Sequence, residues 1–156
     1  MTAPQTQTEN SASHTSVDIG QIPHDIIEAG RERIAEILQG GIERAHGCVT
    51  ADHVIDMVLR DEMQMWGITE TDGDDTDVLA IFCTELMQYP TGEKACRIAI
   101  MSGTGMSKWL GLLPVVEEFA RSEGCGTMEV HGRKGWGRVL PDYPEIFRAF
   151  RKDLRT

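Results

Sequence analysis

The chain has 156 residues, of which 40% are hydrophobic and 26% are charged, and its net charge is −10 at pH 7. This length and composition are those of one globular domain with one core. No apolar run approaches the length that a bilayer-spanning helix needs, so we expect no contact with a membrane. An acidic chain repels phosphate, which disfavours direct nucleic-acid binding. The residues before Arg31 contain neither a hydrophobic leader nor a basic presequence, so we expect synthesis in the cytoplasm.

The charge is unevenly distributed along the chain. Residues 1–120 contain 7 basic and 20 acidic side chains, a net charge of −13, whereas residues 121–156 contain 8 basic and 5 acidic ones, a net charge of +3. Two regions of opposite sign favour head-to-tail contacts between protein chains. A solvated basic face without a partner is the alternative.

The first residues have an unusual composition. Residues 1–20 are rich in Thr, Ser, Gln and Asn and poor in apolar side chains. Such a segment buries too little surface to offset the entropy that it loses on ordering. We therefore predict a flexible N-terminal tail over 1–20 that orders only against another chain, and a single folded domain over 21–156.

Two helices are predicted after Pro23. The first ends near Gly47, and its apolar residues recur at three- and four-residue spacing: Ile34, Ile37, Leu38 and Ile42. The second begins at Thr50, a good N-cap residue, and has Asp52 in its first turn.

From Met63 the pattern changes to that of strands. Residues 63–66 alternate in polarity, and residues 69–77, with five carboxylates, are predicted to form an acidic loop. Residues 78–89 and 94–101 are predicted to form an antiparallel hairpin, because the residues between them are typical of a turn.

A Ser- and Gly-rich loop over 102–107 is predicted to open the next helix. Pro114 requires that this helix either kinks there or begins near Leu113. A strand over 127–131 and a Gly- and Arg-rich segment follow, and residues 146–154 are predicted to form a last strand, with a helix as the alternative. The residues expected to face the sheet from the helix are Trp109, Leu112, Leu113 and Val116.

This order of elements, together with the run Gly132-Arg133-Lys134-Gly135-Trp136-Gly137-Arg138, resembles the GNAT superfamily of acyltransferases. Within it, the chain is most similar to small GNAT-like proteins of tailed bacteriophages and prophages. Residues 97–154 resemble the half of the fold that binds acetyl-CoA. The resemblance implies an α/β (α+β) fold with a central mixed, mainly antiparallel sheet flanked by helices.

In active members of that superfamily, the loop before the third helix reads Gln/Arg-x-x-Gly-x-Gly/Ala, and its N–H groups bind the CoA pyrophosphate. Residues 102–107 occupy these positions; Gly105 keeps the central glycine, whereas Ser102 and Ser107 depart from the motif. The cofactor-binding residues that the resemblance implies are Ser102, Gly103, Gly105, Ser107 and Arg133.

The superfamily's general acid is commonly a Tyr on the helix after the fifth strand. Leu140, which cannot donate a proton, stands at that position, and Tyr143 can replace it only if the loop folds back. Glu85 is the candidate general base, because an apolar setting makes a carboxylate a stronger base. The alternative for Glu85 is a structural ion pair with a neighbouring Arg or hydroxyl.

The remaining polar groupings are not typical of metal sites. The acidic stretch 72–77 lacks the residue order of a calcium loop, and His46, Cys48 and His53 lack zinc-site spacing and a fourth ligand. We therefore predict no metal. The four cysteines are widely spaced, so we expect reduced thiols. Trp136 is predicted to fill the core beneath a Gly-rich turn, and Arg133 to bind a phosphate or an acidic partner.

The departures from the acyltransferase motifs lead to a functional expectation. We expect a non-catalytic GNAT-like component of a phage virion or gene-transfer particle that acts through contacts with other protein chains or in a homo-oligomer, without a cofactor. The alternative is an acetyl-CoA-dependent N-acyltransferase that acts on a small amine or on a protein amine.

Overall fold

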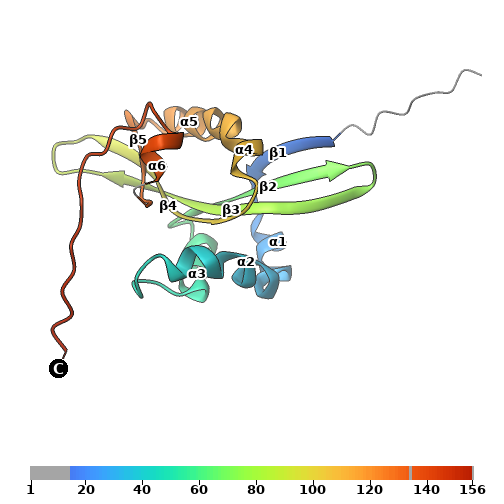
Figure 1. The fold of residues 1–156 in the computed structure, drawn as a ribbon, viewed down its shortest axis with the longest axis horizontal. Coiled ribbons are helices and arrows are strands. Elements are labelled where there is room, and N and C mark those ends of the chain that lie inside the picture. Colours follow the sequence, from blue (N-terminus) through green and yellow to red (C-terminus); the bar gives the residue numbers. More distant parts are fainter. Residues whose placement is uncertain (1–14, 134, 156) are drawn as a thin grey trace, which may run out of the picture.

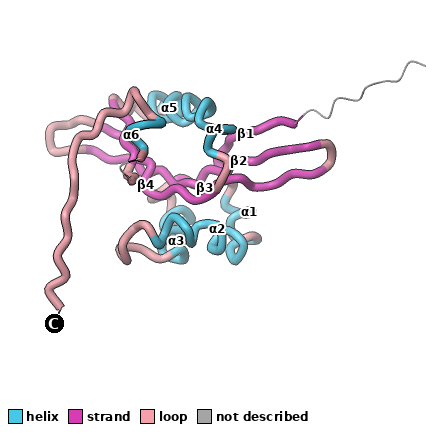
Figure 2. Tube along the Cα trace, in the orientation of Figure 1, coloured by secondary structure: helices cyan, strands magenta, loops and turns pink. Residues whose placement is uncertain are grey.

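The computed structural model describes residues 15–133 and 135–155. Figures 1 and 2 show a curled sheet with helices on both faces. The first elements are β1 (Thr15–Gln21), α1 (His24–Ala29), α2 (Arg31–Glu43), α3 (Ala51–Leu59), β2 (Gln64–Asp72) and β3 (Asp75–Gln88). They are followed by β4 (Lys94–Gly103), α4 (Met106–Trp109), a 3₁₀ turn η1 (Leu110–Leu112), α5 (Leu113–Ser122), β5 (Thr127–Val130) and α6 (Trp136–Val139).

The five strands lie in the order of the sequence, β1-β2-β3-β4-β5. The first four run antiparallel to their neighbours, and β5 runs parallel to β4. This arrangement confirms the predicted mixed, mainly antiparallel sheet, and the predicted β3–β4 hairpin is present. The helix-containing connection between β4 and β5 is what allows these two strands to be parallel.

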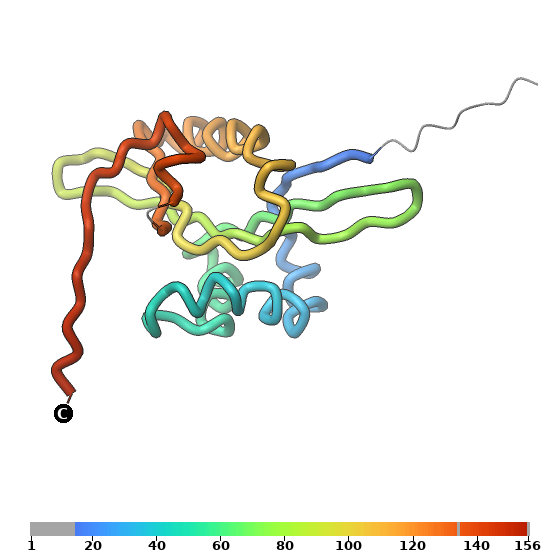
Figure 3. The backbone as a smooth tube through the Cα atoms, viewed as in Figure 1, coloured from blue at the N-terminus to red at the C-terminus, as the bar shows by residue number. Residues whose placement is uncertain are grey.

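Helices α1–α3 lie on one face of the sheet and α4–α6 on the other (Figure 3), and each group covers a hydrophobic core. One lies beneath α1–α3 and contains Leu38, Ile55 and Met65, all nearly inaccessible to solvent. The other lies beneath α4–α6 and contains Phe82 and Val116. A sheet covered on both faces explains the long apolar run in the middle of β3, because its side chains are buried on either side.

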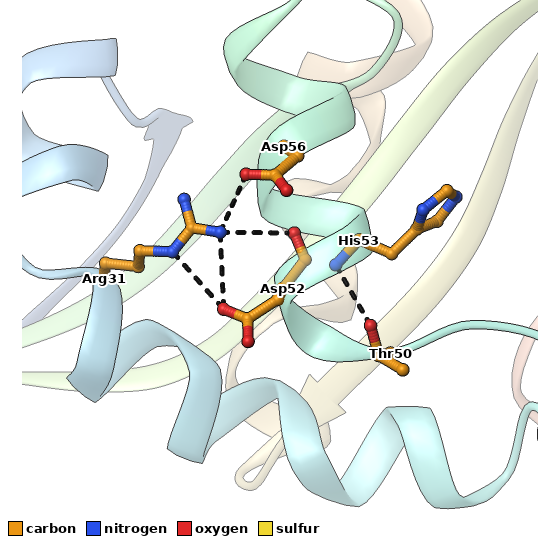
Figure 4. Close-up of polar contacts among 5 residues, drawn as sticks. All are labelled: Arg31, Thr50, Asp52, His53 and Asp56. Carbon is orange, nitrogen blue, oxygen red and sulfur yellow. Dashed lines mark hydrogen bonds and ion pairs between the residues drawn. The ribbon is translucent and has the colours of Figure 1, made fainter.

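Helix α3 is held by a cap at its N-terminus and by ion pairs to α2. The Thr50 hydroxyl accepts a hydrogen bond from the His53 amide at 3.1 Å, which confirms the predicted N-cap (Figure 4). The Arg31 guanidinium donates to the Asp56 carboxylate at 2.7 Å and to the Asp52 carboxylate at 3.3 Å. These contacts join the start of α2 to the first two turns of α3.

Helix α2 lies directly on β4 because of a glycine. A Cβ atom at Gly41 would lie 2.7 Å from the Met101 carbonyl oxygen, so no side chain fits between the helix and the strand. Gly41 is buried, and its lack of a side chain permits this close approach of the helix to the strand.

The N-terminal strand β1 corrects a predicted boundary. Residues 15–20, predicted as part of a flexible tail, pair with β2 from Thr15↔Asp72 to Gln21↔Trp66. Val17 and Ile19 pack against the core beneath α4–α6. Backbone pairing with β2 supplies the stabilisation that the sparse apolar content of this segment lacks. The rest of the predicted tail, residues 1–14, lies outside the described residues.

Two further predictions are wrong. The acidic stretch 69–77 is not a loop but the end of a β2–β3 hairpin, in which Gly73 and Asp74 form a two-residue turn and Gly73 has a φ of 61°. The predicted last strand over 146–154 is absent, because these residues have no regular structure and lie beside no strand.

Candidate active site

Strands β4 and β5 pair over four residues and then part, since β5 ends at Val130 whereas β4 continues. The last pair is Ile98↔Val130, and one more bond, from the His131 amide to the Ile98 carbonyl oxygen at 2.9 Å, closes the ladder. Beyond it β4 continues to Gly103 with β3 on one side. On its other side no described strand follows, so this edge of β4 can accept hydrogen bonds from a bound molecule.

A β-bulge lies where the two strands part. Cys83 pairs with Ile100 and Thr84 pairs with Ile98, so Ala99 is an extra residue in β4. The bulge reverses which side chains face which core: Ile98 packs beneath α4–α6, whereas Ile100 packs beneath α1–α3. Bulges bend a strand and increase its twist, and they are common beside active sites.

A cleft of about 1660 Å³ opens at this point. Its walls come from the α2–α3 connection, the end of β4, the end of β5, α5, α6 and the C-terminal segment. The predicted site residues that line it are Glu85, Gly103, Arg133 and Tyr143. Residues from the cores on both faces of the sheet line it.

The loop after β4 leads directly into α4. Gly103 has a φ of 150°, and a Cβ atom there would lie 2.3 Å from the Leu79 carbonyl oxygen, so this position excludes a side chain. Gly105, with a φ of 70°, is the N-cap residue of α4. The N–H groups of Met106 and Ser107, which begin the helix, have no acceptor within it. The loop therefore presents amide donors next to the parted strands.

Ser102 has a structural contact instead of facing the cleft. Its hydroxyl accepts a hydrogen bond from the Gly41 amide at 3.1 Å and donates one to the Ile37 carbonyl oxygen. The residue is 4% exposed. Any contact of Ser102 with a cofactor must therefore come from its backbone. Ser107 is exposed at the surface of α4.

Pro114 divides the helix that the sequence predicted. The segment consists of α4, the 3₁₀ turn η1 and α5, and Pro114 lies in the first turn of α5, where a missing N–H costs no helical hydrogen bond. The predicted kink is therefore accommodated by η1. Because α4 begins directly after the loop, a helical N-terminus lies beside the loop even though α5 begins only at Leu113.

Glu85 belongs to a network that crosses three strands. The Arg97 guanidinium donates to the Glu85 carboxylate at 3.0 Å and to the Glu129 carboxylate at 3.1 Å, and the Tyr89 hydroxyl donates to Glu129. Desolvation acts to raise the pKa of Glu129, but the hydrogen bonds from Tyr89 and Arg97 lower it overall. The geometry of Glu85 is thus that of the structural ion pair which we weighed as the alternative to a general base.

His131, which the sequence analysis did not single out, lies where the strands part. Its ring contacts the Phe147 ring edge-to-face, with the centroids 5.6 Å apart. Desolvation and the positive charge of Arg97 lower the pKa of His131 below its ordinary value of 6.5. The imidazole is therefore neutral at neutral pH and can accept a proton. The only signal in the sequence is its place at the end of a predicted strand and before the Gly-rich segment.

Tyr143 folds back onto the domain, as its candidate role requires. Its hydroxyl donates to the Glu117 carboxylate of α5 at 3.1 Å. Burial and the charge of Glu117 raise the pKa of Tyr143, so the phenol stays protonated. Leu140 is 7% exposed and packs in the core beneath α4–α6, so it is a core residue.

The Gly-rich segment turns around Trp136. A Cβ atom at Gly132 would lie 2.0 Å from a ring carbon of Trp136, so the indole lies directly on this glycine. The half-buried Trp136 packs against the core beneath α4–α6, as predicted. Arg133 is exposed on the cleft and forms no ion pair with a described residue. Lys134 lies outside the described residues.

Within residues 15–133 and 135–155, no group of His, Cys, Asp and Glu side chains is arranged to hold a metal ion. None of the helices in this part of the chain is both long and apolar enough to cross a bilayer. All four cysteines are free, and burial raises the pKa of the Cys83 thiol to about 12.

The fold is that of the GNAT acetyltransferases. A ribosomal-protein-alanine N-acetyltransferase from Brucella melitensis biovar Abortus 2308 matches with a TM-score of 0.60 and 14% identity, over 90% of this chain and 99% of its own. The aminoglycoside N-acetyltransferase AAC(6')-Iy in complex with CoA matches with a TM-score of 0.61 and 14% identity, over 93% and 99%. A GNAT family acetyltransferase from Staphylococcus aureus matches with a TM-score of 0.58 and 13% identity, over 89% and 99%. No family model and no curated protein matches the sequence.

These comparisons correct the functional expectation. Several structures that share the fold are named as acetyltransferases, which contradicts the expectation of a non-catalytic virion or assembly component. None of the comparisons supports the resemblance to bacteriophage proteins. The expectation that no cofactor is needed has no support either, because AAC(6')-Iy is in complex with CoA.

Proposed function

We propose that this protein is an N-acyltransferase that transfers the acetyl group of acetyl-CoA to an amine. The observation that carries the proposal is the parting of β4 and β5 beyond the bond from His131 to Ile98, which opens the cleft beside an unpaired edge of β4. An extended pantetheine chain can pair with such an edge as a strand does.

The glycine loop supplies the complementary anion site. The N–H groups of Met106 and Ser107, which follow Gly105, lie at the start of α4, and backbone donors at a helix N-terminus attract phosphate. Arg133 is exposed on the same cleft without an ion-pair partner among the described residues, so it can pair with a CoA phosphate. These donors fit the pyrophosphate although Ser102 and Ser107 depart from the superfamily's motif.

We assign the proton transfers to His131 and Tyr143. The amine nitrogen attacks the thioester carbonyl carbon, a C–N bond forms, and the C–S bond breaks. Neutral His131 accepts the proton that the amine loses, since its pKa is lowered. Tyr143 remains protonated and is the candidate donor to the departing thiolate. The Arg97 guanidinium donates to the Glu85 carboxylate at 3.0 Å. This ion pair helps to position the network of Glu85, Arg97 and Glu129 beside the base.

The charge of the protein favours an amine substrate. The net charge is −10, and Glu85, Glu117 and Glu129 line the cleft. Such a field raises the local concentration of cationic amines. The neighbours include enzymes named for a ribosomal-protein alanine and for aminoglycosides, so both a protein N-terminus and a small polyamine are suitable acceptors to test.

An assay of free thiol released from acetyl-CoA tests this function. The protein is mixed with acetyl-CoA and, in parallel, with an N-terminal alanine peptide, an aminoglycoside and a simple diamine. Amine-dependent release above the hydrolysis background, abolished by Gly105→Glu, is the expected result. Absence of amine-dependent release with every acceptor, from protein that binds acetyl-CoA, would count against a catalytic role.

A further inference from the structure

The C-terminal segment 144–155 exposes more apolar surface than any other part of the described chain. The exposed fractions of its large apolar side chains are 69% for Ile146, 57% for Phe147, 91% for Phe150 and 82% for Leu154. No other large apolar residue among the described ones exceeds 55%. A soluble protein rarely leaves four such side chains exposed within nine residues unless they bind a partner.

The spacing of these residues is that of an amphipathic helix. Ile146, Phe147, Phe150 and Leu154 fall at i, i+1, i+4 and i+8, which places them along one stripe. Pro144 suits the first helical position and Glu145 the first turn. Arg151, Lys152 and Arg155 suit the last turns, because cations are favoured at a helix C-terminus. In the structure, however, the segment has no regular secondary structure.

So short a helix is marginal in water unless its apolar face is packed. The segment runs away from the domain (Figure 1). Its contacts with the domain include the ring contact of Phe147 with His131 and a hydrogen bond from Arg151 to the His46 carbonyl oxygen at 2.8 Å. Neither contact buries the stripe. The segment therefore has the pattern of an element that folds when it docks on another surface.

The charge of the C-terminal segment indicates which kind of surface it docks on. Residues 145–155 contain four basic and two acidic side chains, so they carry +2, and the rest of the chain carries −12. An anionic lipid surface would attract the segment but repel the remainder of the protein. A second copy of this chain offers a localised acidic surface on which the segment alone can dock.

The most acidic surface on a second copy is the end of the β2–β3 hairpin, residues 69–78, which we call the acidic arm. Asp72, Asp74, Asp75 and Asp77 are exposed there and form no ion pair with any described residue. Val78, 50% exposed, lies on the same arm. The arm and the C-terminal segment lie at opposite ends of the molecule (Figures 1 and 3), so one chain cannot bring them together.

We infer that two copies of this chain associate by docking the C-terminal segment of each, folded as a helix, on the acidic arm of the other. Opposite charges orient the segment, and the apolar stripe is buried in the contact. The exchange is reciprocal and closes on itself, as in most two-fold dimers. The exposed pairs Glu145–Arg148 and Asp153–Arg155 within the segment are worth little, so they do not oppose docking.

Sedimentation velocity and circular dichroism of the full-length protein test the inference. Wild type is expected to dimerise and to gain helix as its concentration rises. Phe150→Glu, which alters only the stripe, is expected to raise the dimer dissociation constant at least about tenfold. The double variant Arg148→Glu/Lys152→Glu is also expected to raise the dimer dissociation constant. The control variant Arg33→Glu/Arg60→Glu makes the same change of net charge on α2 and after α3, and it is expected to leave the dissociation constant unchanged.

Exchanging charges between the acidic arm and the C-terminal segment tests whether these two surfaces contact each other. Asp74→Lys with Asp77→Lys is expected to weaken the dimer, and combining it with Arg148→Glu and Lys152→Glu is expected to restore it. A wild-type protein that stays monomeric, or that gains helix only on anionic vesicles, overturns the inference. So does a combined variant that remains monomeric while both of its parents are folded.

Discussion

The His131 amide donates to the Ile98 carbonyl oxygen at 2.9 Å, and beyond this bond β5 and β4 separate. The same residue that ends the ladder therefore places an imidazole where the cleft opens. Its pKa is lowered by desolvation and by Arg97, so the side chain is a base at neutral pH. If His131 accepts the proton of the amine, its ionisation should control the rate.

Replacing His131 by Gln is expected to lower kcat/KM about 10²- to 10⁴-fold, the usual contribution of a general base. The affinity for acetyl-CoA should stay within a factor of about two, since the backbone bond to Ile98 remains. Glu85→Gln, which alters the network with Arg97 and leaves the imidazole in place, is the matched control. Loss of turnover in Glu85→Gln but not in His131→Gln would instead identify the carboxylate as the base.

The pH dependence has a definite sign. Because the pKa of His131 lies below 6.5, the imidazole is already neutral at pH 7, and the rate should fall only as the pH drops through that lowered pKa. Rates measured with saturating acetyl-CoA from acid to neutral pH should show this fall in wild type. The His131→Gln variant should not show this fall in rate. If the variant shows the same fall, a group other than His131 titrates.

The contact of Ser102 with α2 predicts a stability effect at a position that resembles part of a cofactor motif. Ser102→Ala removes the buried hydroxyl that bridges the Gly41 amide and the Ile37 carbonyl oxygen, and it should cost about 1–3 kcal/mol in the free energy of unfolding. Ser107→Ala, at an exposed hydroxyl of the same loop, should change it by less than about 0.5 kcal/mol. Urea denaturation measures both; equal effects would mean that the Ser102 hydroxyl is not buried against α2.

Leu113 is 4% exposed in the core beneath α4–α6, as the sequence predicted. Leu113→Ala should lower the free energy of unfolding by about 2–5 kcal/mol. Val115→Ala on the same helix, where the side chain is 46% exposed, is the control and should cost less than about 0.5 kcal/mol. A small effect at Leu113 in equilibrium denaturation would show that α5 does not pack on the sheet.

The elements that could be predicted from the sequence are those whose determining residues lie close together in the chain. The Thr50 cap, the apolar spacing of α2 and the turn between β3 and β4 depend on residues within a few positions of one another. By contrast, β1 contains few apolar residues and is held by β2, whose paired residues lie some fifty positions away. No pattern within residues 15–20 indicates that pairing.

The candidate site was predicted only in part for the same reason. Gly103 and Gly105 stand out in the sequence because glycine is needed where φ is positive. His131 has no such pattern, since its importance depends on where β4 and β5 part. The predicted strand over 146–154 required a neighbouring strand that the described chain does not supply, and its helical spacing became meaningful only once its exposure was known.

Calorimetric titration of the full-length protein with acetyl-CoA tests the central claim most directly. We predict micromolar binding to wild type and at least about tenfold weaker binding to Gly105→Glu, because a carboxylate at the loop opposes the pyrophosphate. Gly92→Glu, at a glycine in the β3–β4 turn that also has a positive φ, carries the same charge and a similar backbone strain and should bind as wild type does. No binding to folded wild type, or equal binding to wild type and Gly105→Glu, would contradict the assignment of the cleft as an acyl-CoA site.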